Sequence, residues 1–284
     1  MTETSPSTSK IQQSLQQLKS YIGEQIIGQD VLVERMLIAL LSDGHVLVEG
    51  APGLAKTRAI NVLSKGIEGD FHRLQFTPDL LPADLTGTDI YRPQEGTFEF
   101  RKGPLFHNLI LADEINRAPA KVQSALLEAM EERQISVGDK SYPLDDLFMV
   151  MATQNPIEQE GTYPLPEAQL DRFLCQIQIH YPDLSSEREI VLKTTGITLA
   201  SVEEKLSADQ LSHAQSLTRQ VPVGEGVVDS ILRLVRSGRP ETTDLDIVRE
   251  RVSWGPGPRA SQALMLACRA RALLRGRLAP SLED

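Results

Sequence analysis

One segment constrains this chain more than any other: a short apolar stretch, a tight loop, and then Lys-Thr at the start of a helical pattern. The apolar stretch is residues 45–49, and it is followed by Gly50-Ala51-Pro52-Gly53-Leu54-Ala55-Lys56-Thr57. A strand, a loop and a helix N-terminus in this order direct backbone N–H groups at one point, which favours an anion. The pattern predicts a phosphate-binding loop in which Lys56 reaches the β- and γ-phosphates and the Thr57 hydroxyl contacts Mg²⁺.

One position departs from the usual loop, which has glycine immediately before the lysine, whereas this chain has Ala55. We expect Ala55 to enter the first helical turn, where alanine is a better helix former than glycine, so that the loop tolerates the change. Taken alone, the segment could also be a glycine-containing turn that joins a strand to a helix and binds nothing.

A second apolar run, residues 109–112, ends in Asp113 and Glu114. It is typical of a buried parallel strand whose carboxyl end delivers side chains to a ligand crevice. We expect Asp113 to hold Mg²⁺ and Glu114 to orient and polarise an attacking water. A third apolar run, residues 147–152, leads to Asn155, which could hydrogen-bond the γ-phosphate or the water, although Asn-Pro is also a common turn.

The order of the predicted elements indicates an α/β core followed by a helical region. Strands are predicted at residues 45–49, 71–76, 109–113, 147–152 and 175–179, and they alternate with helices. This alternation predicts a parallel sheet that is covered by helices on both faces. Segments 87–100 and 134–145 are expected to be β-hairpins inserted into the pattern, with turns near Gly96 and Gly138.

Beyond Tyr181-Pro182-Asp183 the pattern is helical, clearest at residues 207–220, 227–237 and 260–274. Two further helices are expected before the first strand, at residues 11–22 and 31–41. The chain is therefore divided into an α/β core over residues 1–182, which includes the N-terminal helices, and an all-α domain over residues 183–284.

These pieces resemble a known family. The motifs GAPGLAKT, LADEINRAP, LLEAMEERQ, ATQNP and LPEAQLDRF, in that order, are similar to those of MoxR-type AAA+ ATPases. The resemblance extends from Ile27-Gly28-Gln29 to Gly257-Pro258-Arg259, and the family itself carries alanine before the P-loop lysine. It implies a P-loop AAA+ parallel sheet sandwiched by helices, with β-hairpin insertions, followed by an all-α lid domain. The hairpins correspond to the helix-2 insert and pre-sensor-1 hairpin of the clade that includes magnesium-chelatase motor subunits.

The resemblance also implies roles for particular side chains. Asn155 matches sensor 1, Arg172 matches the arginine finger that reaches the neighbouring subunit's nucleotide, and Arg259 matches sensor 2, which touches the γ-phosphate of its own subunit. A planar guanidinium suits the charge that spreads over a transferring phosphoryl group. Without the family, Arg172 would be a surface ion pair with Asp171 or Glu167, and Arg259 a charge that begins a helix. The implied nucleotide-binding residues are Gly28, Gly50, Ala51, Pro52, Gly53, Leu54, Ala55, Lys56, Thr57 and Arg259.

The function implied by the resemblance is Mg²⁺-dependent ATP hydrolysis that drives chaperone-like remodelling or maturation of protein clients. An active site shared between subunits requires head-to-tail contacts and hence a closed ring, expected to be a hexamer. The implied partner is a protein with a von Willebrand factor A domain. Two alternatives remain open: a chelatase-type motor subunit for metal insertion, and a nucleotide-dependent assembly scaffold with little turnover. A DNA-translocating helicase is a poor match, because the few cations of the two hairpins are mixed with acids.

Composition limits the remaining classes. The net charge of −10 disfavours sequence-independent binding to nucleic acid, and no apolar run approaches the ~20 residues that span a bilayer. Cys175 and Cys268 lie in apolar segments, which favours a reducing compartment, and we expect a cytoplasmic protein. Residues 1–9 are polar and are expected to form a frayed tail and not a signal peptide. Family chains continue with a further short helix where residues 278–284 stop, which suggests a truncated C-terminus.

Overall fold

The centre of the molecule is a parallel sheet of five strands in the order β2-β5-β8-β1-β9. The computed structural model describes residues 6–51, 53–156, 161–194 and 205–284. The strands of the sheet are β1 (Val46–Glu49), β2 (Phe71–Gln75), β5 (Leu109–Asp113), β8 (Met149–Gln154) and β9 (Cys175–Gln178). The predicted α/β fold and its five strands are confirmed, with small differences at the strand ends. The largest difference is in β8, which begins and ends later than expected.

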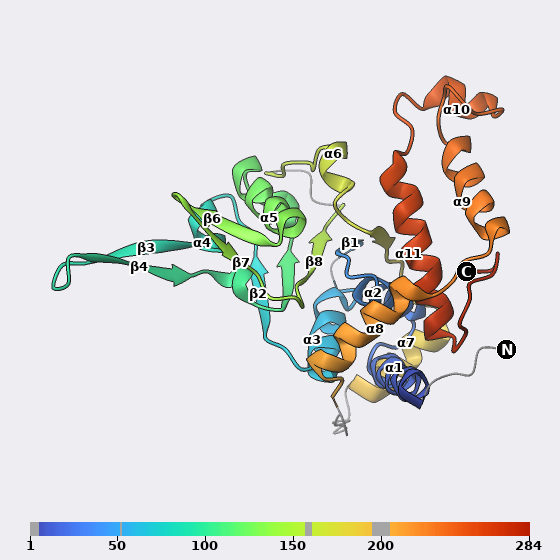
Figure 1. Cartoon of the computed structure of the whole chain (residues 1–284), viewed down its shortest axis with the longest axis horizontal. Coiled ribbons are helices and arrows are strands. Elements are labelled where there is room, and N and C mark those ends of the chain that lie inside the picture. Colours follow the sequence, from blue (N-terminus) through green and yellow to red (C-terminus); the bar gives the residue numbers. More distant parts are fainter. Residues whose placement is uncertain (1–5, 52, 157–160, 195–204) are drawn as a thin grey trace.

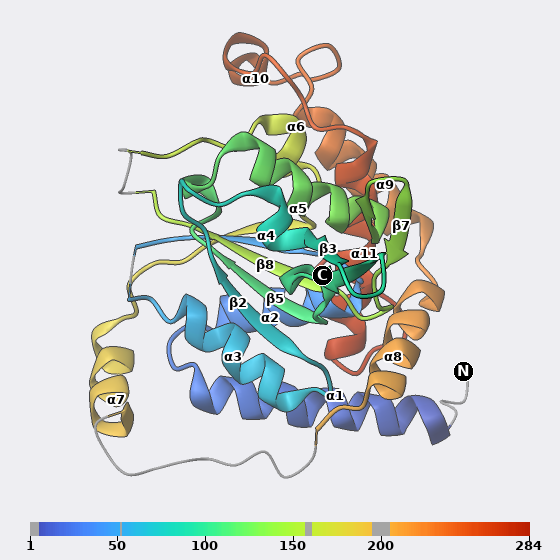
Figure 2. The same cartoon turned by 90° about the vertical axis from the view of Figure 1, so that its left-hand side faces the viewer.

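Alternate residues of the strands face two separate apolar cores. Leu109 and Leu111 of β5 lie in the first core, whereas Ile110 and Ala112 lie in the second. Because both faces are covered, the strands are apolar almost throughout, as is usual for a parallel sheet. The covering helices are α1 (Pro6–Gln25), α2 (Asp30–Leu41) and α3 (Lys56–Gly66) on the first face, and α4 (Pro82–Thr86) and α5 (Ala120–Glu132) on the second (Figure 2).

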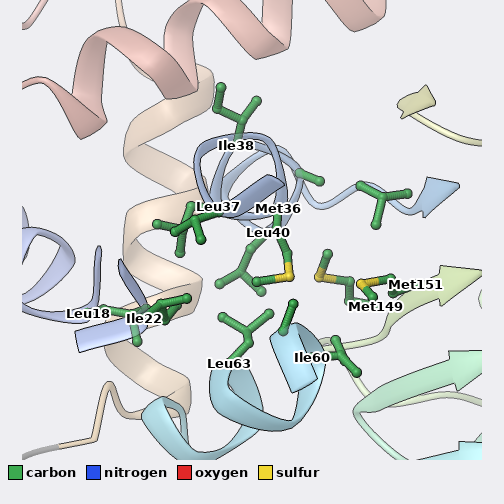
Figure 3. Packing of buried hydrophobic residues seen from close by; sticks show 14 of the residues in the cluster. Leu18, Ile22, Met36, Leu37, Ile38, Leu40, Ile60, Leu63, Met149 and Met151 are labelled. Atoms are coloured by element: carbon green, nitrogen blue, oxygen red, sulfur yellow. The ribbon is translucent and has the colours of Figure 1, made fainter. Parts of the chain in front are cut away.

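The first core fixes the helix that begins at the P-loop. Met149 and Met151 of β8 extend toward Leu40 of α2 and toward Ile60 and Leu63 of α3 (Figure 3). Burying an aliphatic side chain of this size contributes about 1.5–3 kcal/mol. Helix α3 is therefore held firmly against the sheet, and its first residue is held with it.

Two hairpins extend from the second face of the sheet, as predicted. They are built from β3 (Gly87–Arg92) with β4 (Thr97–Lys102) and from β6 (Gln134–Val137) with β7 (Lys140–Pro143), each an antiparallel pair. The β3–β4 hairpin projects well away from the body of the molecule (Figure 1). Gly138 in the β6–β7 turn has a φ of +58°, a conformation that glycine adopts without strain.

Part of the helical region that follows the sheet packs back onto the N-terminal helices. They are α7 (Leu184–Thr194), α8 (Ala208–Gln220), α9 (Glu225–Ser237), α10 (Asp246–Arg251) and α11 (Pro258–Leu274). Leu211 of α8 and Leu273 of α11 lie in the first core, and α11 contacts α1, α2, α8 and α9. Helices α9 and α10 extend away from the sheet beside α11 (Figure 1). Packing of α11 on α2 and α8 therefore fixes where its first turn lies.

The described residues also include three short helical segments: η1 (Pro104–Phe106), η2 (Ile115–Arg117) and α6 (Glu167–Leu170).

The prediction of a frayed tail over residues 1–9 is wrong for its second half, because α1 begins at Pro6; residues 1–5 lie outside the described residues. Proline suits the first turn of a helix, where its missing N–H has no partner to lose. Cys175 and Cys268 are free thiols. Across the described residues, none of the helices is both long and apolar enough to span a bilayer.

Candidate active site

The loop between β1 and α3 corrects one expectation about Ala55. Helix α3 begins at Lys56, and Ala55 precedes it with φ +61° and ψ +16°. The expectation that Ala55 lies in the first helical turn is therefore wrong. It adopts the left-handed conformation that glycine, the usual residue here, adopts freely and that costs alanine roughly 1–2 kcal/mol. Gly53 is also left-handed, at φ +84°, and Pro52 lies outside the described residues.

Lys56 lies at the base of this loop. Its ammonium nitrogen donates to the carbonyl oxygen of Gly50 at 2.7 Å and to that of Gln154, the last residue of β8, at 3.4 Å. Burial lowers the pKa of Lys56, and nearby carboxylates, that of Asp113 first among them, oppose this shift. The lysine thus lies between the loop and the acidic strand end, where its positive charge would stabilise a bound anion most strongly.

Asp113, at the end of β5, is 8% exposed and has two side-chain partners. The Thr153 hydroxyl donates to its Oδ1 at 2.6 Å, and the Arg73 guanidinium donates to its Oδ2 at 2.7 Å through Nη2 and at 3.2 Å through Nε. These bonds fix the orientation of the carboxylate. Sequence reasoning missed both partners, although Thr153 lies near the end of β8, the strand that pairs with β5.

Glu114 has a strained backbone, with φ +59° and ψ +50°. Its N–H donates to the Thr153 hydroxyl at 2.9 Å, while its Oε2 accepts from the Gln75 amide at 2.8 Å and pairs with Arg117 Nε at 3.0 Å. Non-glycine residues in this conformation cluster at functional sites, where the surrounding contacts hold them. Gln75 was also missed from the sequence; its only signal is that it ends the strand that pairs with β5.

The predicted phosphate and metal residues meet around one cavity of about 340 Å³. An anion there would meet the Lys56 ammonium, the Thr57 hydroxyl and the N-terminus of α3. Hydroxyl and carboxylate oxygens are the ligands that Mg²⁺ takes beside phosphate, so Thr57 and Asp113 suit it. The residues lining the cavity are Gly53, Ala55, Lys56, Thr57, Arg58, Asp113, Glu114 and Asn155.

A second cavity, of about 310 Å³, adjoins the P-loop on its apolar side. Its walls include Ile27, Leu54, Pro182 and Ile190, which suit a flat aromatic base. Gly28, predicted to bind nucleotide, does not line it; it has φ +71°, and a Cβ there would lie 2.8 Å from the Cβ of Ser186. Gly28 therefore permits the close approach of the segment that carries Pro182.

Gly50 and Ala51, both predicted to bind nucleotide, do not line the phosphate cavity. Gly50 accepts the Lys56 ammonium through its carbonyl oxygen, and Ala51 packs against the first core. Their contribution is to hold the loop in place.

The two predicted arginines lie together, away from that cavity. Arg172 Nη2 pairs with Glu131 Oε2 at 3.0 Å, and Arg259 Nη2 donates to Glu131 Oε1 at 2.6 Å. Both line a separate groove of about 350 Å³, to which Met130 and Glu131 at the C-terminal end of α5 also contribute. Arg259, expected to touch the γ-phosphate of its own chain, does not line the phosphate cavity in this structure; the packing of α11 on α2 and α8 places it beside Arg172. The alternative ion pair of Arg172 with Asp171 or Glu167 is replaced by the pair with Glu131.

A P-loop, an acidic strand end, an asparagine on the next strand and a helical C-terminal region define an ATPase of the AAA+ class. The family profile described as "ATPase family associated with various cellular activities (AAA)" matches residues 45–175, and the AAA lid domain profile matches residues 245–284. The chain is 50% identical over 253 residues to chaperone MoxR1 of Mycobacterium tuberculosis, a match that covers 89% of this chain and 67% of that protein. The chain belongs to the MoxR-type AAA+ ATPases, and the predicted family is confirmed.

Two further proteins are similar to this chain over most of their own length. The uncharacterized protein YeaC of Bacillus subtilis is 42% identical over 258 residues, which is 90% of this chain and 78% of that protein. A crystal structure of a Cytophaga hutchinsonii protein classed as an ATPase is 42% identical and has a TM-score of 0.88, covering 98% of this chain and 85% of that one.

Proposed function

We propose that this ATPase hydrolyses Mg²⁺-ATP at sites shared between neighbouring subunits of a ring and uses the energy to remodel or mature protein clients. The observation that carries the proposal is the separation of the site into two surfaces. One surface is the phosphate cavity, and the other is the groove that holds Arg172 and Arg259. A head-to-tail contact would bring the groove of one subunit to the cavity of the next.

Within one chain, the side chains of the cavity divide the chemistry of phosphoryl transfer. Lys56 neutralises charge on the β- and γ-phosphates, and Thr57 and Asp113 would hold Mg²⁺, which spreads that charge further when it is bound. Glu114 orients and polarises the attacking water, in an orientation fixed by Gln75. Asn155, 6% exposed, donates its amide to the γ-phosphate or the water.

The neighbouring chain supplies the remaining positive charge. Guanidinium groups stabilise the equatorial oxygens of a transferring phosphoryl group better than an ammonium does, because they present several donors in one plane. Arg172 acts in this way in our proposal, and Arg259 acts beside it on the same nucleotide. A contact that repeats head to tail closes as a ring, which we propose to be a hexamer.

The proposed client is a protein, and by family resemblance one with a von Willebrand factor A domain, in the cytoplasm. The projecting β3–β4 hairpin supports a protein client, because Ile90, Tyr91 and Phe98 on it are 42%, 53% and 68% exposed. Exposed apolar side chains that gather on one element favour protein contacts. The net charge of −10 favours a protein over a nucleic acid.

The deciding experiment is steady-state ATP hydrolysis per subunit, measured with Mg²⁺ over a range of protein concentrations. We expect the specific rate to rise with concentration in parallel with the assembled fraction seen by analytical ultracentrifugation. A specific rate that does not depend on concentration, from a monomer, would place the whole site within one chain and overturn the shared site. Nucleotide binding and assembly without turnover at any concentration would favour the scaffold alternative.

A further inference from the structure

One carboxylate joins the two arginines of the groove. Glu131, in the last turn of α5, pairs through Oε2 with Arg172 and through Oε1 with Arg259. The two arginines come from distant parts of the chain, one after α6 and the other in the first turn of α11. Glu131 is therefore the point at which the helical C-terminal region and the α/β core present positive charge together.

The arrangement is anchored on α5. Arg172 also donates from Nη1 to the carbonyl oxygen of Leu127 at 2.7 Å, one helical turn before Glu131. Its guanidinium thus lies along the helix with both ends fixed, and its side chain is 29% exposed. Arg259 is 55% exposed and has Glu131 as its ion-pair partner within the described residues. Arg259 is consequently the arginine whose position depends most on Glu131.

Electrostatics explains why a carboxylate is needed at this point. Two guanidinium groups that approach the same small region repel each other, and a carboxylate between them offsets that repulsion by attracting both. The hydrogen bond from Arg259 and the charge of Arg172 lower the pKa of Glu131, so it is ionised at neutral pH. Because Glu131 is 34% exposed, these ion pairs contribute little to overall stability, and their main effect is on side-chain geometry.

We propose that Glu131 is a positioning residue for ATP hydrolysis in the neighbouring subunit: it holds Arg172 and Arg259 side by side before that subunit's nucleotide arrives. The inference rests on the proposed shared site. Two arginine side chains that are already held in place lose less conformational entropy on contacting a phosphate than two that are free to move. This smaller entropy cost raises the rate of hydrolysis. Glu131 itself does not line the phosphate cavity of its own chain.

The test compares Glu131→Gln with a matched control, Glu132→Gln. Glu132 is the next residue of α5, is exposed, and takes part in none of the ion pairs found among the described residues. At protein concentrations that saturate assembly, we expect E131Q to lower kcat about tenfold while KM for ATP changes by less than about twofold. E132Q should match the unmodified protein, and E131D should recover part of the loss because it restores the charge.

A second readout separates positioning from structural damage. Mixing E131Q with K56A should restore turnover, since K56A carries an intact Glu131 and both arginines, and the E131Q chain carries an intact P-loop. Thermal unfolding midpoints and binding of a fluorescent ADP to E131Q should be unchanged.

Three results bear on the inference differently. A normal or increased kcat in E131Q, with R172A inactive, would overturn the role of Glu131 and leave the shared site intact. Failure of K56A to restore E131Q would show that Glu131 acts within its own chain, against the inference. If R172A itself turns over normally, the proposed shared site fails, and the role of Glu131 fails with it.

Discussion

Ala55 is strained in a way that glycine would not be. Its φ is +61°, and a left-handed backbone costs a residue with a Cβ about 1–2 kcal/mol. Glycine removes that cost but loses more entropy on folding. We expect A55G to raise the free energy of unfolding by about 0.5–1 kcal/mol in urea denaturation. The control is Ala59, buried in the interior of α3, where A59G should lower it by about 1 kcal/mol or more. If both substitutions destabilise, Ala55 is not strained.

His45 makes stability depend on pH. Burial, with a smaller effect from Arg133, lowers its pKa to about 3, and its Nδ1 accepts the N–H of Val150. The unfolded chain binds a proton on this residue near pH 6.5, whereas the folded chain does not until about pH 3. The contribution is therefore complete above pH 6.5 and is lost as the pH falls, by up to about 1.4 kcal/mol per pH unit.

The measurement compares urea unfolding of the unmodified protein and His45→Gln between pH 4.5 and 7.5. H45Q should be less stable at pH 7.5, and the gap should narrow as the pH falls, because only the unmodified protein carries this titration. Parallel curves would show that the pKa of His45 is the same in the folded and unfolded states, against the burial effect.

Residues that share a motif or a strand end could be predicted, while their partners could not. Lys56 and Thr57 are fixed by the local loop. Asp113 ends β5 and Asn155 follows β8, two strands whose carboxyl ends meet at one edge of the sheet. Arg73 reaches Asp113 only because β2 lies beside β5, and strand order is not encoded in the local pattern. The roles of the predicted residues stay predictions until they are tested.

At the scale of elements, the two hairpins are coupled by one aromatic contact. Phe100 of β4 stacks on Tyr142 of β7 with ring centroids 4.1 Å apart and an angle of 18° between the rings. Both residues are partly buried, and aromatic pairs in such contact contribute about 0.5–1.5 kcal/mol beyond their buried area. A double-mutant cycle of F100A and Y142A should therefore give a coupling free energy of about 1 kcal/mol in urea unfolding.

A matched cycle on the exposed tip pair, Tyr91 and Phe98, should give a smaller value, because that pair lies within one hairpin and is open to solvent. Additive effects of F100A and Y142A would mean that the hairpins are independent. The existence of both hairpins could be predicted from alternation and turn glycines, but this contact could not, since it depends on how the hairpins pack on the sheet.

At the scale of the whole molecule, the placement of Arg259 depends on the longest-range packing in the chain. The resemblance gives its identity, but α11 packs on α2 and α8, so the groove that Arg259 lines could not be inferred from the residues around it. Arg259 does not line the phosphate cavity of its own chain. The question is therefore whether it acts on the nucleotide of its own chain or on that of the neighbouring subunit.

Mixing two inactive chains answers that question. K56A has a defective P-loop and intact arginines, whereas R259A has an intact P-loop and lacks one arginine; each should be inactive alone. If Arg259 acts on the neighbour, random assembly of an equal mixture pairs an intact P-loop with an intact Arg259 at about a quarter of the interfaces. The mixture should then hydrolyse ATP at about a quarter of the unmodified rate.

If Arg259 served its own nucleotide, no chain in the mixture would carry both intact parts, and the mixture would stay inactive. The pair K56A with R172A is the positive control, and K56A with E114Q, both defective in the same cavity, is the negative one. Recovery with R172A but not with R259A would assign the two arginines to different nucleotides, although one carboxylate holds them. Equal recovery would mean that the groove acts as a single unit on the next subunit.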